Sequence, residues 1–164
     1  MDPNIYKASL KNLARIRALI SKSARILQSP YYKQSEIETA LELVSGIEEL
    51  ISAGSFFVAE YQNSFIGCGG WTIDASDAQK AEIRGFFVHP DCARRGVATR
   101  LLAACENECL HKGIQTLYLT ATLSGEPFYK KCGFSELERF RQGLSNGESF
   151  ELVKMAKEIQ RIEA

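Results

Sequence analysis

The stretch VHPDCARRGVATRLL, residues 88 to 102, constrains the fold of this chain more than any other. It predicts an apolar strand that ends at His89-Pro90, a short turn with two arginines, and a helix that begins directly after Gly96. The first turn of a helix leaves backbone N–H groups without partners, and the helix dipole adds partial positive charge there. Arg94 and Arg95 add charge beside these donors. The pattern favours a phosphate or pyrophosphate site, and the alternative is a surface turn with two solvated arginines.

The rest of the chain alternates between strand and helix periods. The predicted strands cover residues 5–8, 55–61, 64–73, 81–88, 116–122, 134–140 and 150–156. The predicted helices cover residues about 12–23, 97–111 and 126–131, with a further turn at 48–53. Another helix is predicted to begin at Ser35 as its N-cap, with Glu38 as the capping-box partner. The order is β-α-α-β-β-β-α-β-α-β-β, which predicts an α/β layered fold around one mixed sheet.

The composition argues against several classes of protein. Lys plus Arg and Asp plus Glu number 20 each, so no overall field attracts nucleic acid or an anionic membrane. The beginning MDPNIYKAS lacks the basic and apolar regions of a signal peptide, and no apolar run approaches the length of a membrane span. The five cysteines form no Cys-x-x-Cys pair and offer no metal-ligand set, which favours buried free thiols in a reducing compartment. We therefore expect a cytoplasmic protein without a metal.

A second motif follows the strand TLYLTAT. It reads SGEPFYKKCGF, from Ser124 to Phe134, and predicts a short helix stopped by Gly133. Together with the arginine turn, in this order and at this separation, it resembles the GNAT family of N-acetyltransferases. The resemblance implies a single domain over residues 1–164 with a mostly antiparallel sheet of about seven strands and helices on both faces. Residues 81–140 would form the acetyl-CoA-binding core, and the N-terminal helices within 10–54 would border the acceptor site.

The resemblance also implies how acetyl-CoA, as cosubstrate, would bind. The backbone of Phe86, Phe87 and Val88 would pair with the pantetheine arm, which requires the strand 116–122 to separate from it. The pyrophosphate would lie on the turn and helix start, and Ser124 stands where the family often has a cofactor-contacting Asn, although capping of the next helix explains it equally well. The residues of the turn and helix start are Arg94, Arg95, Gly96, Val97, Ala98 and Thr99. One departure is Ala93, where the family usually has Gln or Arg.

Two residues are candidates for the chemistry. Tyr129 corresponds to the tyrosine that often acts as the family's acid, and a phenol with a pKa of about 10 stays protonated at neutral pH. The alternative is that its ring only pins the short helix to the sheet. Glu82 lies six residues before Val88, at the offset of the family's basic glutamate, and is the candidate base; ordered water or a purely solvated role are alternatives. Backbone N–H groups around Val88 would polarise the carbonyl.

The expected activity is transfer of an acetyl group from acetyl-CoA to a primary amine of a small molecule or protein, in a ternary complex. The alternative is a non-catalytic acyl-CoA-binding or sensing domain on the same fold; a nucleic-acid-binding module is disfavoured by the zero net charge. The sequence does not name the acceptor, and a homodimer is possible. The sequence does not decide the roles of three aromatic residues. Trp71 lies either in the acceptor cleft or in the core, and Tyr31 and Tyr32 either border the acceptor site or are simply exposed in a loop.

Overall fold

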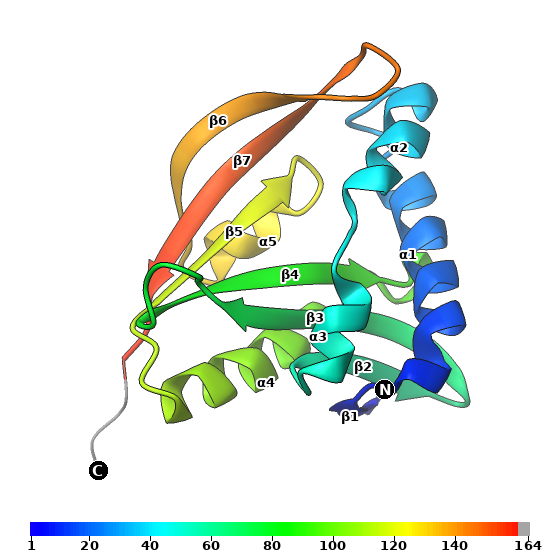
Figure 1. Ribbon diagram of the computed structural model, residues 1–164. Helices are drawn as coiled ribbons and strands as arrows, with labels where there is room; N and C mark the ends of the chain where they lie inside the picture. Colours follow the sequence, from blue (N-terminus) through cyan, green and yellow to red (C-terminus); the bar gives the residue numbers. More distant parts are fainter. Residues whose placement is uncertain (161–164) are drawn as a thin grey trace.

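Seven strands form one sheet in the computed structural model, which describes residues 1–160. Their spatial order is β1-β2-β3-β4-β5-β7-β6, and every neighbouring pair is antiparallel except β4 and β5 (Figure 1). The strands are β1 Asn4–Lys7, β2 Phe56–Tyr61, β3 Ser64–Ile73, β4 Lys80–Val88, β5 Thr116–Thr122, β6 Ser135–Gly143 and β7 Ser149–Glu158. The predicted mixed, mostly antiparallel sheet is confirmed.

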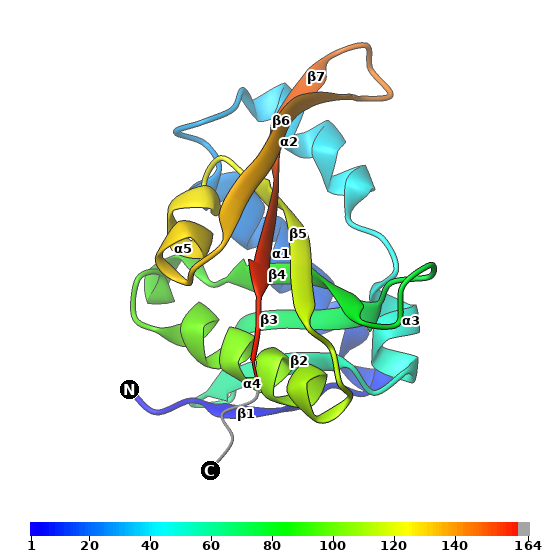
Figure 2. The ribbon, with the colours of Figure 1, turned by 90° about the vertical axis from the view of Figure 1, so that its left-hand side faces the viewer.

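Helices cover both faces of this sheet (Figure 2). They are α1 Leu13–Leu27, α2 Gln34–Ala40, α3 Ile47–Ser52, α4 Val97–His111 and α5 Glu126–Lys131, with single 3-10 turns η1 Leu10–Asn12, η2 Leu41–Leu43 and η3 Pro90–Cys92. The two long helices bury apolar residues at helical spacing, α1 with Ile16, Leu19 and Ile20, and α4 with Leu101 and Cys105. Each helix therefore presents one stripe to the sheet.

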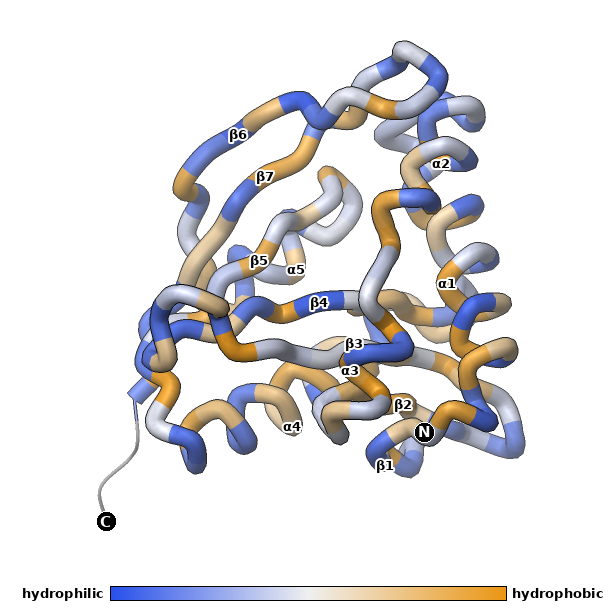
Figure 3. Tube along the Cα trace, in the orientation of Figure 1, coloured by the Kyte–Doolittle hydropathy of each residue, from blue (hydrophilic) through white to orange (hydrophobic). Residues whose placement is uncertain are grey.

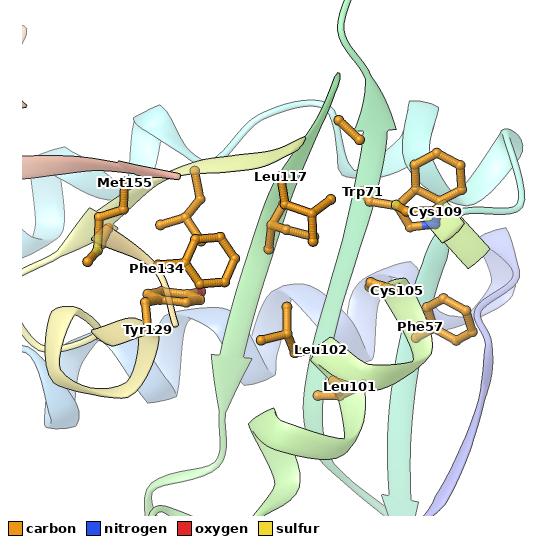
Figure 4. Close-up of a cluster of buried hydrophobic side chains, with 14 of the residues drawn as sticks. Phe57, Trp71, Leu101, Leu102, Cys105, Cys109, Leu117, Tyr129, Phe134 and Met155 are labelled. Carbon is orange, nitrogen blue, oxygen red and sulfur yellow. The ribbon is translucent and has the colours of Figure 1, made fainter. Parts of the chain in front are cut away.

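The core divides along the two faces because strand residues alternate between them. On one face, α4 and α5 pack on β2 to β5 and β7 in the cluster of Figure 4, which includes Leu101, Leu117, Tyr129 and Met155. On the other face, α1 and α3 cover apolar residues of β2 and β3. A third cluster joins α2 to the β6–β7 hairpin. The edge strand β6 is exposed along most of its length and largely hydrophilic (Figure 3).

Some predicted boundaries in the N-terminal third are wrong. The first helix continues to Leu27 rather than ending near residue 23. The second helix begins at Gln34, and Lys33 N donates to Glu36 Oε1 at 2.9 Å, so the expected cap at Ser35 is displaced by two residues. Ser35 Oγ instead donates to Glu148 Oε2 of the β6–β7 hairpin at 3.1 Å, a partner that local sequence does not reveal. The turn of helix expected at 48–53 is confirmed as α3, displaced by one residue.

Two findings concern metal binding and membrane spanning. Across residues 1–160, no three His, Cys, Asp or Glu side chains gather closely enough to ligate a metal ion. Cys105 and Cys109, the cysteines spaced four apart on α4, are fully buried in the core. None of the helices in the described part of the chain is both long enough and apolar enough to cross a membrane.

Candidate active site

The strands β4 and β5 separate after three residue pairs. Lys80 to Glu82 pair in parallel with Thr116 to Tyr118, and the pairing ends there. On its other edge, β5 pairs with β7 along its whole length, as far as Thr122 opposite Leu152. Within residues 1–160, the remainder of β4, residues 83–88, pairs with no strand on its β5 side, and the diverging strands are visible in Figure 1. This is the separation that the family resemblance required.

A β-bulge lies in the part of β4 that pairs with β3 but not with β5. Gly85 has a φ of +69°, and the register with β3 shifts between Cys68 and Gly70. A side chain at the facing Gly69 would overlap the ring of Phe86, so this glycine makes room for the bulge. After the bulge, Phe86 packs against the α4 side of the sheet, whereas Phe87 packs against the α1 side.

The bulged strand directs polar backbone atoms into the gap. His89 N donates to Ile66 O of β3 at 2.8 Å. Because successive N–H groups of a strand point to opposite edges, the N–H and C=O of Val88 point away from β3, toward the gap. An extended ligand chain lying in the gap would therefore meet a free donor and a free acceptor on β4.

The turn after β4 ends in two left-handed residues. Arg94 has a φ of +62° and Gly96 one of +83°, and Gly96 is the N-cap of α4. A left-handed arginine is uncommon and marks a backbone held by its surroundings. His89 Nδ1 accepts from Asp91 N at 3.1 Å, which shapes the preceding 3-10 turn.

The donors at this turn are free. Within residues 1–160, no backbone or side-chain acceptor binds the N–H groups of residues 94–99, and the first α4 bond is Arg100 N to Gly96 O at 3.1 Å. Arg94, Arg95 and Gly96 are exposed. A Cβ placed on Gly96 would have no atom within 4 Å, so open space adjoins the row of donors. This combination of free N–H groups, a helix N-terminus and two arginines suits an anionic group such as pyrophosphate.

Tyr129 of α5 lies next to the bulge. Its ring makes edge-to-face contacts with Phe86, Phe128 and Phe134 at centroid distances of 6.5, 5.1 and 5.7 Å, and Figure 4 shows it beside Phe134 in the core. The side chain is 9% exposed, and burial raises its pKa well above the usual value. The hydroxyl makes no hydrogen bond within residues 1–160. Since no fully buried polar side-chain atom of that part lacks a partner, the hydroxyl reaches accessible space.

Ser124 lies in the turn between β5 and α5, at the far side of the gap. The turn is held by Thr122, whose Oγ1 accepts from Gly125 N at 3.2 Å and lies 3.0 Å from Ser124 Oγ. The N-cap of α5 is Gly125, without a side-chain cap. Helix capping, the alternative explanation for Ser124, therefore does not apply.

Glu82 lies on the opposite face of the sheet from Tyr129. Its neighbours Ala81 and Ile83 face the α4 side, so the Glu82 side chain points to the face that α1 and α3 partly cover. Burial raises the pKa of Glu82, and Arg84 opposes this shift, with Arg84 Nε 3.4 Å from Glu82 Oε1. Arg84 also donates to Ser45 O at 2.7 Å, which ties this site to the segment before α3.

A hollow of about 360 Å³ opens beside Glu82. Its other lining residues come from the three strands that follow in the sheet: Tyr118, Thr120, Glu138, Phe140 and Lys154. Alternation along TLYLTAT already places Tyr118 and Thr120 on one face, but the sequence contains no signal that β7 and then β6 lie next to β5. These lining residues were therefore missed by sequence reasoning.

The structure shows where the three aromatic residues lie whose roles the sequence did not decide. Trp71 is 5% exposed in the α4-side core, where its Nε1 donates to Glu108 at 3.0 Å. Tyr32 is buried and stacks on Phe150 at 3.8 Å; its hydroxyl donates to Glu151 O at 2.6 Å and accepts from Leu123 N at 2.8 Å. Tyr31 is 49% exposed. Core packing and loop exposure account for all three.

The comparisons with known proteins agree with this geometry. The chain has an α/β fold with a sheet that splits beside a helix N-terminus able to hold an anion. It belongs to the acetyltransferase (GNAT) family, whose model it matches over residues 20–134. A search of curated proteins gives no significant match.

Solved structures show the same fold at low sequence identity. A GCN5-related N-acetyltransferase from Rhodopseudomonas palustris has a TM-score of 0.79 and 21% identity, with 97% of each chain covered. The PaiA N-acetyltransferase of Thermoplasma acidophilum, solved in complex with coenzyme A, has a TM-score of 0.76 and 22% identity, with 97% of this chain and 100% of that chain covered. The ribosomal-protein-S18-alanine N-acetyltransferase of Escherichia coli has a TM-score of 0.68 and 15% identity, with 99% and 97% covered.

Proposed function

We propose that this protein is an acetyl-CoA-dependent N-acetyltransferase that transfers the acetyl group directly to a primary amine in a ternary complex. The observation that carries the proposal is the continuity between two features: the unpaired edge of β4 at residues 83–88 and the free N–H groups of residues 94–99. One suits an extended pantetheine arm, and the other suits the pyrophosphate to which that arm is joined. Family membership and the coenzyme A complex of the PaiA enzyme support this reading.

In this proposal, the backbone edge of Phe86, Phe87 and Val88 holds the pantetheine arm, and residues 94–99 hold the pyrophosphate. Ser124 contacts the cofactor from the β5–α5 turn across the gap. Ala93, in place of the family's usual Gln or Arg, removes one side chain but none of the backbone donors, so binding is weakened rather than lost. Acetyl-CoA, when bound, supplies an activated acetyl thioester.

The two candidate catalytic residues approach the gap from opposite faces of the sheet. Glu82 takes the proton of the attacking amine, directly or through water, as the new C–N bond forms and the C–S bond breaks. Its raised pKa makes the Glu82 carboxylate a stronger base than an ordinary glutamate. Tyr129 donates its phenolic proton to the leaving thiolate, and burial keeps that proton in place until the thiolate forms. Backbone N–H groups around Val88, on the bulged edge of β4, polarise the carbonyl.

The acceptor site is proposed on the Glu82 face, bordered by the helices within residues 10–54. Access from this face leaves the α4 side to the cofactor. The acceptor is a small molecule or a protein amine, and a cytoplasmic location and a homodimer remain predictions for the whole chain.

Calorimetric titration with acetyl-CoA, CoA and ADP, followed by a free-thiol assay with a panel of amines, tests the proposal. Binding of acetyl-CoA and CoA together with amine-dependent thiol release supports it. Binding without thiol release for any amine would favour the non-catalytic acyl-CoA-binding alternative. Failure of both CoA species to bind at millimolar concentration would refute the cofactor site.

A further inference from the structure

The hollow beside Glu82 contains a pattern of charge that restricts the acceptor. It lies on the sheet face away from α4 and α5, and its volume of about 360 Å³ falls at the lower end of the range for small-molecule sites, roughly 300 to 1,000 Å³. The inference rests on the proposed function, because it assumes that the amine reacts beside Glu82.

The charges of the lining alternate across the sheet. Glu82 of β4 is negative, Tyr118 and Thr120 of β5 are neutral, Lys154 of β7 is positive, and Glu138 of β6 is negative. This order comes from the strand order β4-β5-β7-β6 and from the register, which places Lys154 opposite Thr120 on one side and Glu138 on the other. A complementary ligand therefore carries a cation near Glu82 and an anion near Lys154.

Lys154 is available for such an anion. Among the ion pairs of residues 1–160, at a limit of 4.0 Å, none involves Lys154, although Glu138 is its cross-strand neighbour. Arg84, a cation next to Glu82 on this face that does not line the hollow, is engaged with Ser45 O and Glu82. Asp74 is also engaged, since its Oδ1 accepts from the Tyr118 hydroxyl at 2.6 Å. Lys154 is thus the one unengaged cation among the lining residues of this described hollow.

We infer that the acceptor is an amino acid, a primary amine that also carries a free carboxylate, and that Lys154 binds the carboxylate while the amine lies beside Glu82. Lys154 is then a specificity-determining residue. A diamine would complement Glu82 but would bring its second cation toward Lys154, where like charges repel. A lysine or N-terminal residue within a protein has no free α-carboxylate to offer.

The test compares twenty amino acids with their α-carboxamides in the thiol-release assay, at saturating acetyl-CoA. Each pair shares the side chain and the α-amine and differs in the carboxylate. The amide's amine loses its proton more readily, so a preference for the free acid does not come from a larger fraction of unprotonated amine. At least one amino acid is expected to exceed its amide in kcat/KM by about tenfold or more, the size of one charge-assisted contact.

Variants assign that preference to Lys154. In K154M, KM for the preferred amino acid is expected to rise about tenfold or more, so that the ratio of kcat/KM between the amino acid and its amide falls toward one, with the affinity for acetyl-CoA unaffected. K154R keeps the charge and is expected to retain most of the preference. K112M removes an exposed lysine at the C-cap of α4 that does not line the hollow, and is the matched control.

The outcomes separate the two claims. If acetyl-CoA binds and amines are acetylated, but amides or diamines match the amino acids, the inference is overturned and the proposed function stands. A carboxylate preference that survives unchanged in K154M overturns the role of Lys154. If acetyl-CoA does not bind at all, the proposed function itself has failed.

Discussion

The glycine at the start of α4 allows a sharp test of the cofactor site. Gly96 has a φ of +83°, and a Cβ there meets no atom within 4 Å. For an L-residue this backbone costs about 1–2 kcal/mol, and the reduced entropy of the unfolded chain offsets about 0.4–1 kcal/mol of it. We therefore expect G96A to lower the free energy of unfolding by about 1 kcal/mol, which corresponds to roughly 2–4 °C in Tm for a domain of this size.

The chain offers a matched control at the other end of the same helix. Gly113 has a φ of +78°, and a Cβ there also has no neighbour within 4 Å. G113A should therefore cost the same stability, measured by thermal denaturation without ligand. Only G96A places a methyl group beside the free N–H groups of residues 94–99.

Calorimetric titration with acetyl-CoA measures the difference in binding. G96A is expected to raise Kd about tenfold or more, through the loss of at least one charge-assisted hydrogen bond, while G113A binds as the wild type does. Equal losses of affinity in both variants would show that general destabilisation is responsible. Unchanged binding in G96A would refute the assignment of the pyrophosphate to this turn.

Three further substitutions test the remaining assignments. Y129F should lower kcat by roughly a hundredfold or more, with little change in KM for acetyl-CoA or in Tm, since the hydroxyl has no hydrogen bond within residues 1–160; unchanged turnover would leave Tyr129 with packing alone. Burial raises the pKa of Glu82, so its ionised carboxylate destabilises the folded state at a pH above the folded-state pKa. Below the pKa of Glu82 in the unfolded chain, the carboxyl is protonated in both states and this cost is absent. E82Q should therefore raise Tm at about pH 8 but not at about pH 4. The same variant should abolish the acidic limb of the kcat/KM profile; a retained limb would assign it to another group. Y32F removes two hydrogen bonds of a buried hydroxyl and should lower the free energy of unfolding by about 1–3 kcal/mol in urea denaturation, whereas Y31F, at an exposed ring, should change nothing; equal effects would contradict the bridging role of Tyr32.

Local patterns in the sequence determined the parts of the site that lie within one or two adjacent elements. The arginine turn predicts a helix start with free donors because the missing hydrogen bonds are a property of any first helical turn, and Gly96 is the residue that permits the left-handed backbone there. The FYKKCGF motif predicts α5 and places Tyr129 on its inner side. The predicted end of the first helix near residue 23 and the predicted start of the second at Ser35 were wrong, and Ser35 instead donates to Glu148, a distant residue that local sequence does not reveal.

Only the tertiary structure decided what surrounds these motifs. The gap beside β4 exists because the pairing of β4 with β5 ends at Glu82 and Tyr118, while β5 continues alongside β7 on its other edge, and these pairings join residues thirty or more positions apart in the chain. The same pairing places Lys154 and Glu138 on one side of Glu82 and sets the order of charges in the hollow. Period-2 alternation assigns a residue to a face of its own strand, but it carries no information about which strand lies next to it. The sequence therefore determined the chemistry of the cofactor turn, and the strand order determined the gap and the charges that an acceptor would meet.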